Sequence, residues 1–419
     1  MTIGIRHDDL RRRNRAMVLT AVRHADQLSR TGIAAETGLS HSTISAIAAD
    51  LISEGILIEA RPGDTPAPKR GRPQVAVRLN PQATSVVTAS LSMNAMSASV
   101  IDYSGGVIVE ERRRVETLGL SRDDLVETMI AIIEKAMAAA SPAPPPSRMV
   151  LSIQGITDAD EKRLLWSPIT PHEGIDFSDI LSARFGVPVA VENDCNMIAV
   201  ALRWQSPERY GRDFIAVLLS HGIGMGMVLR GELFSGTKSS AGEFGHMVHL
   251  PEGALCRCGR RGCIEAYAGN YAIWRNAHGV AQDQMIAFDV SDEDIRKLAD
   301  RARSGDTLAR EAFRIAGEAI GYGLGNLFSL IDAAPVAFVG TGAHAIDLME
   351  GAIRDSIALT AGGQHVDEVK IDRFLDEEPI MRDGAALHAL SAIDRTVSEG
   401  ARTSPHATPQ RVYSHRMTV

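Results

Sequence analysis

Apolar residues recur with helical spacing in three stretches of the first eighty residues. The first covers about residues 8–24, and a short one covers about residues 29–37, with Ser29 as the expected N-cap and Gly38 as the expected end. The third stretch follows Ser40, and its apolar residues stand at i, i+3, i+4, i+7 and i+8, which predicts a helix with one buried face. These apolar positions are Ile44, Ile47, Ala48, Leu51 and Ile52.

A short helix, a tight turn and an amphipathic helix together indicate a helix-turn-helix motif, whose second helix enters the DNA major groove. Two strands are expected next, over residues 56–60 and 74–79, and the basic loop between them would form a wing near phosphates or the minor groove. An interaction module of three helices, or a solvated basic linker, is the alternative interpretation. The residues expected to contact DNA are Ser40, His41, Ser42, Thr43, Ser45, Arg70 and Arg72.

From about residue 84 the pattern changes to strands that alternate with helices, which favours an α/β fold. A glycine-containing pair of strands followed by helices occurs twice, so we expect two similar α/β lobes with a cleft between them. Strands are expected within residues 84–93, 97–102, 107–116, 149–155, 188–194, 213–233 and 335–342, and helices near 121–140, 177–185, 292–302, 307–330 and 345–359.

The net charge of −8 is unevenly distributed. Residues 1–80 contain 12 Lys/Arg and 8 Asp/Glu (+4), and the remaining residues contain 32 and 44 (−12). A polyanion would therefore attract the basic N-terminal part and repel the rest. The sequence has no apolar run of about 18 residues, so we expect no membrane partner. The N-terminus lacks the apolar region of a signal peptide, which points to the cytoplasm.

Three of the four cysteines lie within eight residues of one another, at Cys256, Cys258 and Cys263. In a reducing compartment such clustering favours a metal site over disulfides. Zinc in a structural site takes four nitrogen or sulfur ligands in a tetrahedron. Spacing leaves His246 and His249 as candidates for the fourth ligand, and a four-ligand set leaves no open position for catalysis. Three free thiols on a loop are the alternative.

Residues 222–269, which contain these cysteines, resemble the signature of the ROK family of repressors, open reading frames and kinases. The segment Glu-Asn-Asp-Cys-Asn at 192–196 resembles the sugar-contacting segment of that family, and the N-terminal part resembles its repressor branch, which includes regulators of xylose, glucose and N-acetylglucosamine use. The resemblance covers about residues 10–395. It implies a two-lobed sugar-binding body of the actin-like or ribonuclease-H-like type behind a winged helix-turn-helix domain.

Carried over position by position, the resemblance implies that the zinc ligands are His246, Cys256, Cys258 and Cys263. It thus selects His246 over His249. It also implies that His246 binds zinc through one ring nitrogen and sugar through the other. The sugar contacts that it implies are Asn193, Asp194, Glu243, His246 and Glu265.

The kinases of the family bind ATP through two phosphate turns, and the resemblance places both at altered residues here. The first falls on Ser90, Ser92, Met93 and Asn94, without the aspartate that organises Mg²⁺ or the paired glycines that admit phosphate. The second reads Ser220-His221-Gly222 in place of Gly-Thr-Gly. We therefore expect no enzymatic activity and no ATP cofactor.

The function predicted on this basis is a sugar-responsive, DNA-binding transcriptional regulator, and more narrowly a repressor of carbohydrate-utilisation genes. It would act as a homodimer or tetramer on operator DNA, with a degenerate kinase body as effector sensor and structural zinc. The alternatives are an active sugar kinase that carries a DNA-binding domain and a regulator controlled by a protein partner. The expected domains are 1–82 for DNA binding, 83–200 with about 380–397 for the first lobe, 201–379 for the second lobe, and a disordered tail over 398–419.

Overall fold

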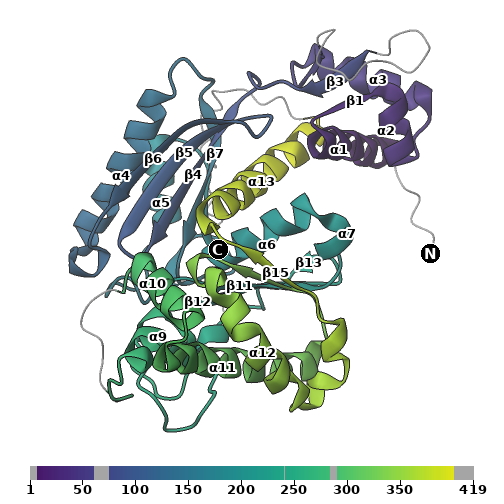
Figure 1. Cartoon of the computed structure of the whole chain (residues 1–419). Coiled ribbons are helices and arrows are strands. Elements are labelled where there is room, and N and C mark those ends of the chain that lie inside the picture. The colour runs from purple at the N-terminus through teal and green to yellow at the C-terminus, as the bar shows by residue number, and fades with distance from the viewer. Residues whose placement is uncertain (1–6, 61–74, 240, 284–289, 401–419) are drawn as a thin grey trace, which may run out of the picture.

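The computed structural model describes residues 7–60, 75–239, 241–283 and 290–400. The chain begins with a unit of three helices and a small antiparallel sheet of order β1-β3-β2 (Figure 1). Ser29 caps α2 by accepting from Gly32 N, and Ser40 caps α3 by accepting from Thr43 N, as the sequence predicts. The loop between β2 and β3, which contains Arg70 and Arg72, lies outside the described residues. The bounds are α1 His7–Ala25, β1 Gln27–Ser29, α2 Arg30–Thr37, α3 His41–Ser53, β2 Leu57–Glu59 and β3 Ala76–Leu79.

Two five-stranded sheets follow, and they share one topology. The first has the order β10-β7-β4-β5-β6 and the second the order β13-β12-β11-β14-β15. In each, three consecutive strands pair antiparallel and two later strands extend the sheet in parallel. The strands of the first sheet are β4 Ser85–Ser92, β5 Ala95–Asp102, β6 Val107–Arg114, β7 Pro146–Ile153 and β10 Val189–Asn193. Those of the second are β11 Phe214–Leu219, β12 Ile223–Leu229, β13 Glu232–Leu233, β14 Val336–Val339 and β15 Ile371–Phe374.

Helices cover both faces of each sheet. Helix α4 (Arg122–Ala139) packs on the outer face of the first sheet, whereas α6 (Asp194–Gln205) and α13 (Glu377–Ser398) pack against each other between the two sheets (Figure 1). The far side of the second sheet shares its apolar core with three helices, α9 (Asn270–Ala277), α11 (Thr307–Ile331) and α12 (Ile346–Ala358). Within the described residues, no helix has the length and apolar character needed to cross a bilayer.

The remaining elements are short or connect the lobes. They are the 3-10 helices η1 Thr117–Gly119, η2 Phe244–His246, η3 Thr341–Ala345 and η4 Ala361–Glu368, the strands β8 Ile156–Thr157 and β9 Leu164–Trp166, and the helices α5 Phe177–Phe185, α7 Pro207–Tyr210, α8 Glu265–Ala268, α9 Asn270–Ala277, α10 Asp292–Arg303, α11 Thr307–Ile331 and α12 Ile346–Ala358.

The predicted mixed α/β fold with repeated strand pairs is confirmed, and each predicted strand and helix of the body has a counterpart. The strand expected within residues 149–155 begins earlier, because β7 already starts at Pro146, which pairs with Ser85 at the end of the ladder. Proline is tolerated at the first residue of a strand. Helix α13 includes Ser398, the first residue of the predicted tail, and residues 401–419 lie outside the described part.

The two helices between the sheets approach at backbone distance. A Cβ at Gly384 of α13 would lie 1.8 Å from the carbonyl oxygen of Met197 in α6. On its other side, α6 lies against β12, where a Cβ at Gly226 would lie 2.1 Å from the carbonyl oxygen of Cys195. No side chain fits at either contact, so glycine at these positions fixes how closely α6 is held between β12 and α13.

We therefore expect Gly384→Ala to lower the free energy of unfolding by about 1–3 kcal/mol, because the added methyl group forces the packed helices apart. Gly351 in α12 is the matched control, since a Cβ there meets nothing within 4 Å. Gly351→Ala should raise stability by about 0.5–1 kcal/mol through helix propensity. Urea denaturation of both variants measures the difference, and equal effects would contradict the close-packing argument.

Candidate functional site

A pocket of about 430 Å³ opens between the two sheets. It is lined by the β4–β5 turn, the β10–α6 junction, the β11–β12 turn, the loop around η2, and the first turns of α10 and α13. The structure brings all five residues predicted to contact sugar to the wall of this pocket. They are Asn193, Asp194, Glu243, His246 and Glu265.

Asn193 and Asp194 stand where β10 ends and α6 begins. The side chain of Asn193 caps the helix, with Oδ1 accepting from Asn196 N at 3.1 Å and Nδ2 donating to the Gly155 carbonyl at 2.9 Å. Oδ1 of Asp194 accepts from Cys195 N at 2.8 Å. Burial raises the pKa of Asp194 to about 7. This carboxyl group is therefore held rigidly in an apolar environment, where it can be neutral near pH 7.

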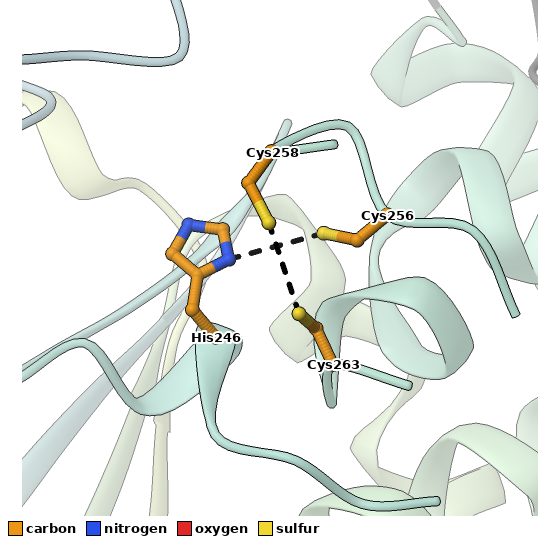
Figure 2. A group of neighbouring side chains, drawn as sticks. All are labelled: His246, Cys256, Cys258 and Cys263. Atoms are coloured by element: carbon orange, nitrogen blue, oxygen red, sulfur yellow. Dashed lines mark hydrogen bonds between the residues drawn. The ribbon is translucent and has the colours of Figure 1, made fainter. Parts of the chain in front are cut away.

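The three clustered cysteines and His246 point at a common centre (Figure 2). The Cys258 and Cys263 sulfurs are 3.8 Å apart, and His246 Nδ1 is 3.8 Å from the Cys256 sulfur. Thiolates about 2.3 Å from one zinc ion in a tetrahedron lie about 3.8 Å apart, so the donor spacing fits this metal. Four nitrogen and sulfur donors complete such a tetrahedron, which is the arrangement of a structural site.

His249, the other histidine candidate, lies outside this cluster. Its ring packs against the rings of Tyr267 and Tyr322, with centroids 4.9 Å and 5.8 Å away. The choice of His246 therefore agrees with the geometry of the four side chains.

Two glutamates connect the cysteine cluster to the pocket. Glu265 is buried, and its Oε2 accepts from Ile223 N at 3.2 Å while the Cys256 sulfur donates to its Oε1 at 3.7 Å. Glu243 Oε2 lies 3.9 Å from Nε2 of His246, the ring nitrogen that faces away from the sulfurs. Burial raises the pKa of Glu243, and the charge of Glu265 adds to this rise while His246 opposes it.

Several pocket residues escaped the sequence analysis. The ring of Trp166, in β9, meets His246 edge-on with centroids 5.9 Å apart and offers an aromatic surface to a ligand. Arg112, Asp292 and Glu377 come from β6, α10 and α13 and line the other end. None lies in a recognisable motif. The rarity of tryptophan, which occurs three times in the chain, is the one sequence signal that could have drawn attention to Trp166.

The first predicted phosphate turn is the two-residue turn between β4 and β5. Its backbone donors are already used, because Met93 N donates to Gln154 Oε1 at 3.1 Å and Asn94 N donates to Thr117 Oγ1 at 3.4 Å. At the β11–β12 turn, Ser220 N donates to the Gly222 carbonyl at 3.1 Å. These amides are engaged within the protein, so they are not free to bind a phosphate group.

Of the residues expected to contact DNA, those that the structure describes lie at the start of α3, in the N-terminal unit and outside the pocket lining (Figure 1). His41, Ser42 and Ser45 are exposed, and Thr43 is half-buried. The Ser40 hydroxyl lies 2.9 Å from that of Ser42 and 2.8 Å from that of Thr43. This end of α3 thus presents short polar side chains to solvent.

A duplicated sheet with a polar cleft between its two copies defines an actin-like α/β protein. The chain belongs to the ROK family, whose sequence model matches residues 94–387. It is 25% identical to the xylose repressor of Caldicellulosiruptor bescii over 332 residues, which cover 78% of this chain and 82% of the relative. It is 23% identical to the DNA-binding transcriptional dual regulator NagC of Escherichia coli over 407 residues, covering 94% and 95%.

Solved structures agree on the fold. A ROK family transcriptional regulator, described as a homologue of the Escherichia coli MLC protein, superposes with a TM-score of 0.74 at 20% identity and covers 94% of this chain and 98% of its own. A ROK family glucokinase from Streptomyces griseus, in complex with glucose and AMPPNP, superposes with a TM-score of 0.59 at 24% identity and covers 73% and 99%.

The raised pKa of Asp194 predicts how stability changes with pH. The folded protein binds a proton at Asp194 more tightly than the unfolded chain, whose carboxyl has its usual pKa of 3.8. Stability is therefore lost as the pH rises from about 4 to about 7. Asp194→Asn keeps the acceptor for Cys195 N and removes this loss. The variant should gain a few kcal/mol relative to wild type between pH 5 and pH 8 in urea denaturation, whereas parallel profiles would contradict a raised pKa.

Proposed function

We propose that this protein is a sugar-responsive, DNA-binding transcriptional repressor of carbohydrate-utilisation genes. The observation that carries the proposal is the course of α13. Its first turn lines the pocket, and its last turns contact α1 of the N-terminal unit (Figure 1). The names of the xylose repressor and of NagC support the same assignment.

The N-terminal unit is proposed to be a winged helix-turn-helix. Helix α3 would enter the major groove through His41, Ser42 and Ser45, which are short or exposed enough to let the helix approach base edges. The Ser40 side chain caps the N-terminus of α3, so its role in DNA binding would be indirect: it would fix where the recognition helix begins. The wing contacts of Arg70 and Arg72 remain part of the proposal, since both residues lie outside the described part of the chain.

The pocket is proposed to bind a sugar. Carboxylates and an amide can accept from and donate to vicinal hydroxyl groups in fixed geometry, and such a site rejects analogues that lack them. Glu243 and Asp194 both line the pocket and come from different segments, the loop before η2 and the start of α6. His246 would direct Nε2 to the ligand while Nδ1 faces the sulfurs. Trp166 would pack against a sugar face.

Buried ion pairs support transmission from α13 to the N-terminal unit. The Asp394 carboxylate accepts from Arg23 Nε at 2.8 Å and Nη2 at 2.9 Å, and from the Tyr103 hydroxyl at 2.6 Å. Arg15 of α1 donates to the Val397 carbonyl at 3.1 Å and pairs with Glu54 of the same unit. A shift of α13 would therefore move α1. In a two-fold dimer, this would change the spacing of two recognition helices on a palindromic operator.

A kinase activity is not favoured by the pocket. The amides of Met93, Asn94 and Ser220 are engaged internally, so these three groups are not available to cradle the phosphates of a nucleotide. Asp194 would then serve as a hydroxyl acceptor. The protein is accordingly proposed to sense sugar without transferring phosphate.

The test of this function needs an operator and a sugar panel. Duplexes selected from a random pool by the full-length protein provide the operator, and anisotropy titrations with xylose, glucose and N-acetylglucosamine measure the response. One sugar should change operator affinity about tenfold. Glu243→Ala should abolish that change and leave sugar-free binding intact. Glu173→Ala, an exposed carboxylate outside the pocket, is the control. The proposal would be contradicted if the selection enriched no DNA sequence, or if the Glu243→Ala variant changed its operator affinity with sugar as the wild type does.

We also propose that His246, Cys256, Cys258 and Cys263 bind one structural zinc ion. The metal would fix the loop that carries Glu243 and His246 and would order the chain up to Glu265, whose Oε2 accepts from Ile223 N at the start of β12. Cys258→Ser should then release zinc from the purified protein and lower the free energy of unfolding by about 3 kcal/mol or more. Elemental analysis and thermal melting measure the two effects. Cys195→Ser changes a cysteine outside the cluster and should leave the zinc content unchanged. Full stability of a metal-free Cys258→Ser protein would contradict the structural role.

A further inference from the structure

The end of the pocket opposite the cysteine cluster is closed by the chain's own carboxylates. Glu377 is the first residue of α13, and its Oε1 accepts from the Ser220 hydroxyl at 2.9 Å. Ser220 follows β11 of the second sheet, so this hydrogen bond joins that sheet to α13 across the pocket. The position nearest the β11–β12 turn is thereby occupied by a negatively charged group of the protein.

Asp292 adds a second carboxylate at this end. It is the first residue of α10, and its Oδ1 is buried without a hydrogen-bond partner among the described residues. Burial raises the pKa of Glu377, and the charges of Asp292 and Asp376 raise it further. No donor among the described residues offsets the charge on the buried Oδ1 of Asp292, so this corner of the pocket disfavours a second anion such as a phosphate group.

The groups that usually bind phosphate are taken here. The N-terminus of α13 is capped by Asp376, which accepts from Glu378 N at 3.3 Å. Arg112, one of two guanidinium groups in the lining, pairs with Glu378 at 2.6 Å. Apart from Asp194, the lining contains six carboxyl groups against two guanidinium groups, and this excess of acidic groups would repel a ligand phosphate.

We propose that Glu377 and Asp292 determine the charge class of the effector, so that the pocket accepts an uncharged polyhydroxy ligand and excludes its phosphorylated form. Glu377 withholds the Ser220 hydroxyl from any phosphate, and Asp292 adds a carboxylate whose buried oxygen receives no hydrogen bond from the described residues. The inference deepens the proposed sugar-sensing function and rests on it for the identity of the ligand. The exclusion of phosphate rests on the pocket's carboxylates and does not depend on which sugar binds.

The first experiment compares each free sugar with its phosphate on the full-length protein by calorimetry, using glucose with glucose 6-phosphate and N-acetylglucosamine with its 6-phosphate. Any sugar that binds should do so at least tenfold more tightly than its phosphate. Equal or tighter binding of the phosphate would overturn the inference.

The second experiment uses pyrophosphate as the probe and needs no sugar. The double variant Asp292→Asn/Glu377→Gln keeps the shape of both side chains and should bind pyrophosphate at least fivefold more tightly than wild type. Glu208→Gln/Glu232→Gln removes the same charge from exposed positions outside the pocket and should gain nothing. A double variant that is folded by circular dichroism and gains no affinity would refute the inference. If no sugar binds to the wild type but the double variant binds pyrophosphate more tightly, the proposed sugar sensing is wrong and the exclusion of phosphate by the carboxylates is supported.

Discussion

The architecture depends on the backbone contact between α6 and α13. Because Gly384 has no side chain, α13 lies against the Met197 carbonyl, and α6 in turn lies against Gly226 of β12. The helix pair therefore forms a single layer between the two sheets. Asp194 at the start of α6 and Glu377 at the start of α13 both reach the same pocket as a consequence of this packing. A looser contact would separate the two walls of the site.

The cysteine cluster holds a loop that regular secondary structure does not hold. Between Glu243 and Glu265, which the structure describes throughout, the only regular element is the 3-10 helix η2, and the four side chains of the cluster bring the two ends of the loop together. Glu265 is held by Ile223 N, and the Cys256 sulfur lies 3.7 Å from its other carboxylate oxygen. A metal held by the four donors, as proposed, would set the position of Glu243 relative to β12. Its proposed role is therefore mechanical.

The sequence allowed the helices of the N-terminal unit, the repeated α/β pattern and the clustered cysteines to be predicted, since periodicity, capping residues and spacing are local signals. Spacing left His246 and His249 equivalent, and only the family resemblance separated them. Helix α13 was assigned to the first lobe without its role being foreseen. Its contact with α1 joins Arg23 to Asp394, 371 residues apart, and no local pattern reports such a pair. The acidic end of the pocket escaped prediction for the same reason, because Ser220, Asp292 and Glu377 come from three separate segments.

The two ends of α13 explain how a ligand in the cleft could act on the N-terminal unit, as the proposed function requires. At one end Glu377 holds the second sheet through Ser220, and at the other Asp394 holds the N-terminal unit through buried Arg23. A ligand that competes for hydrogen bonds near Glu377 acts on the helix itself. Because α13 is one continuous helix of 22 residues, a displacement at its first turn reaches its last turn without an intervening loop. A ligand group at that end would compete with Glu377 for the Ser220 hydroxyl, so the contact that joins α13 to the second sheet is the one most directly exposed to the ligand.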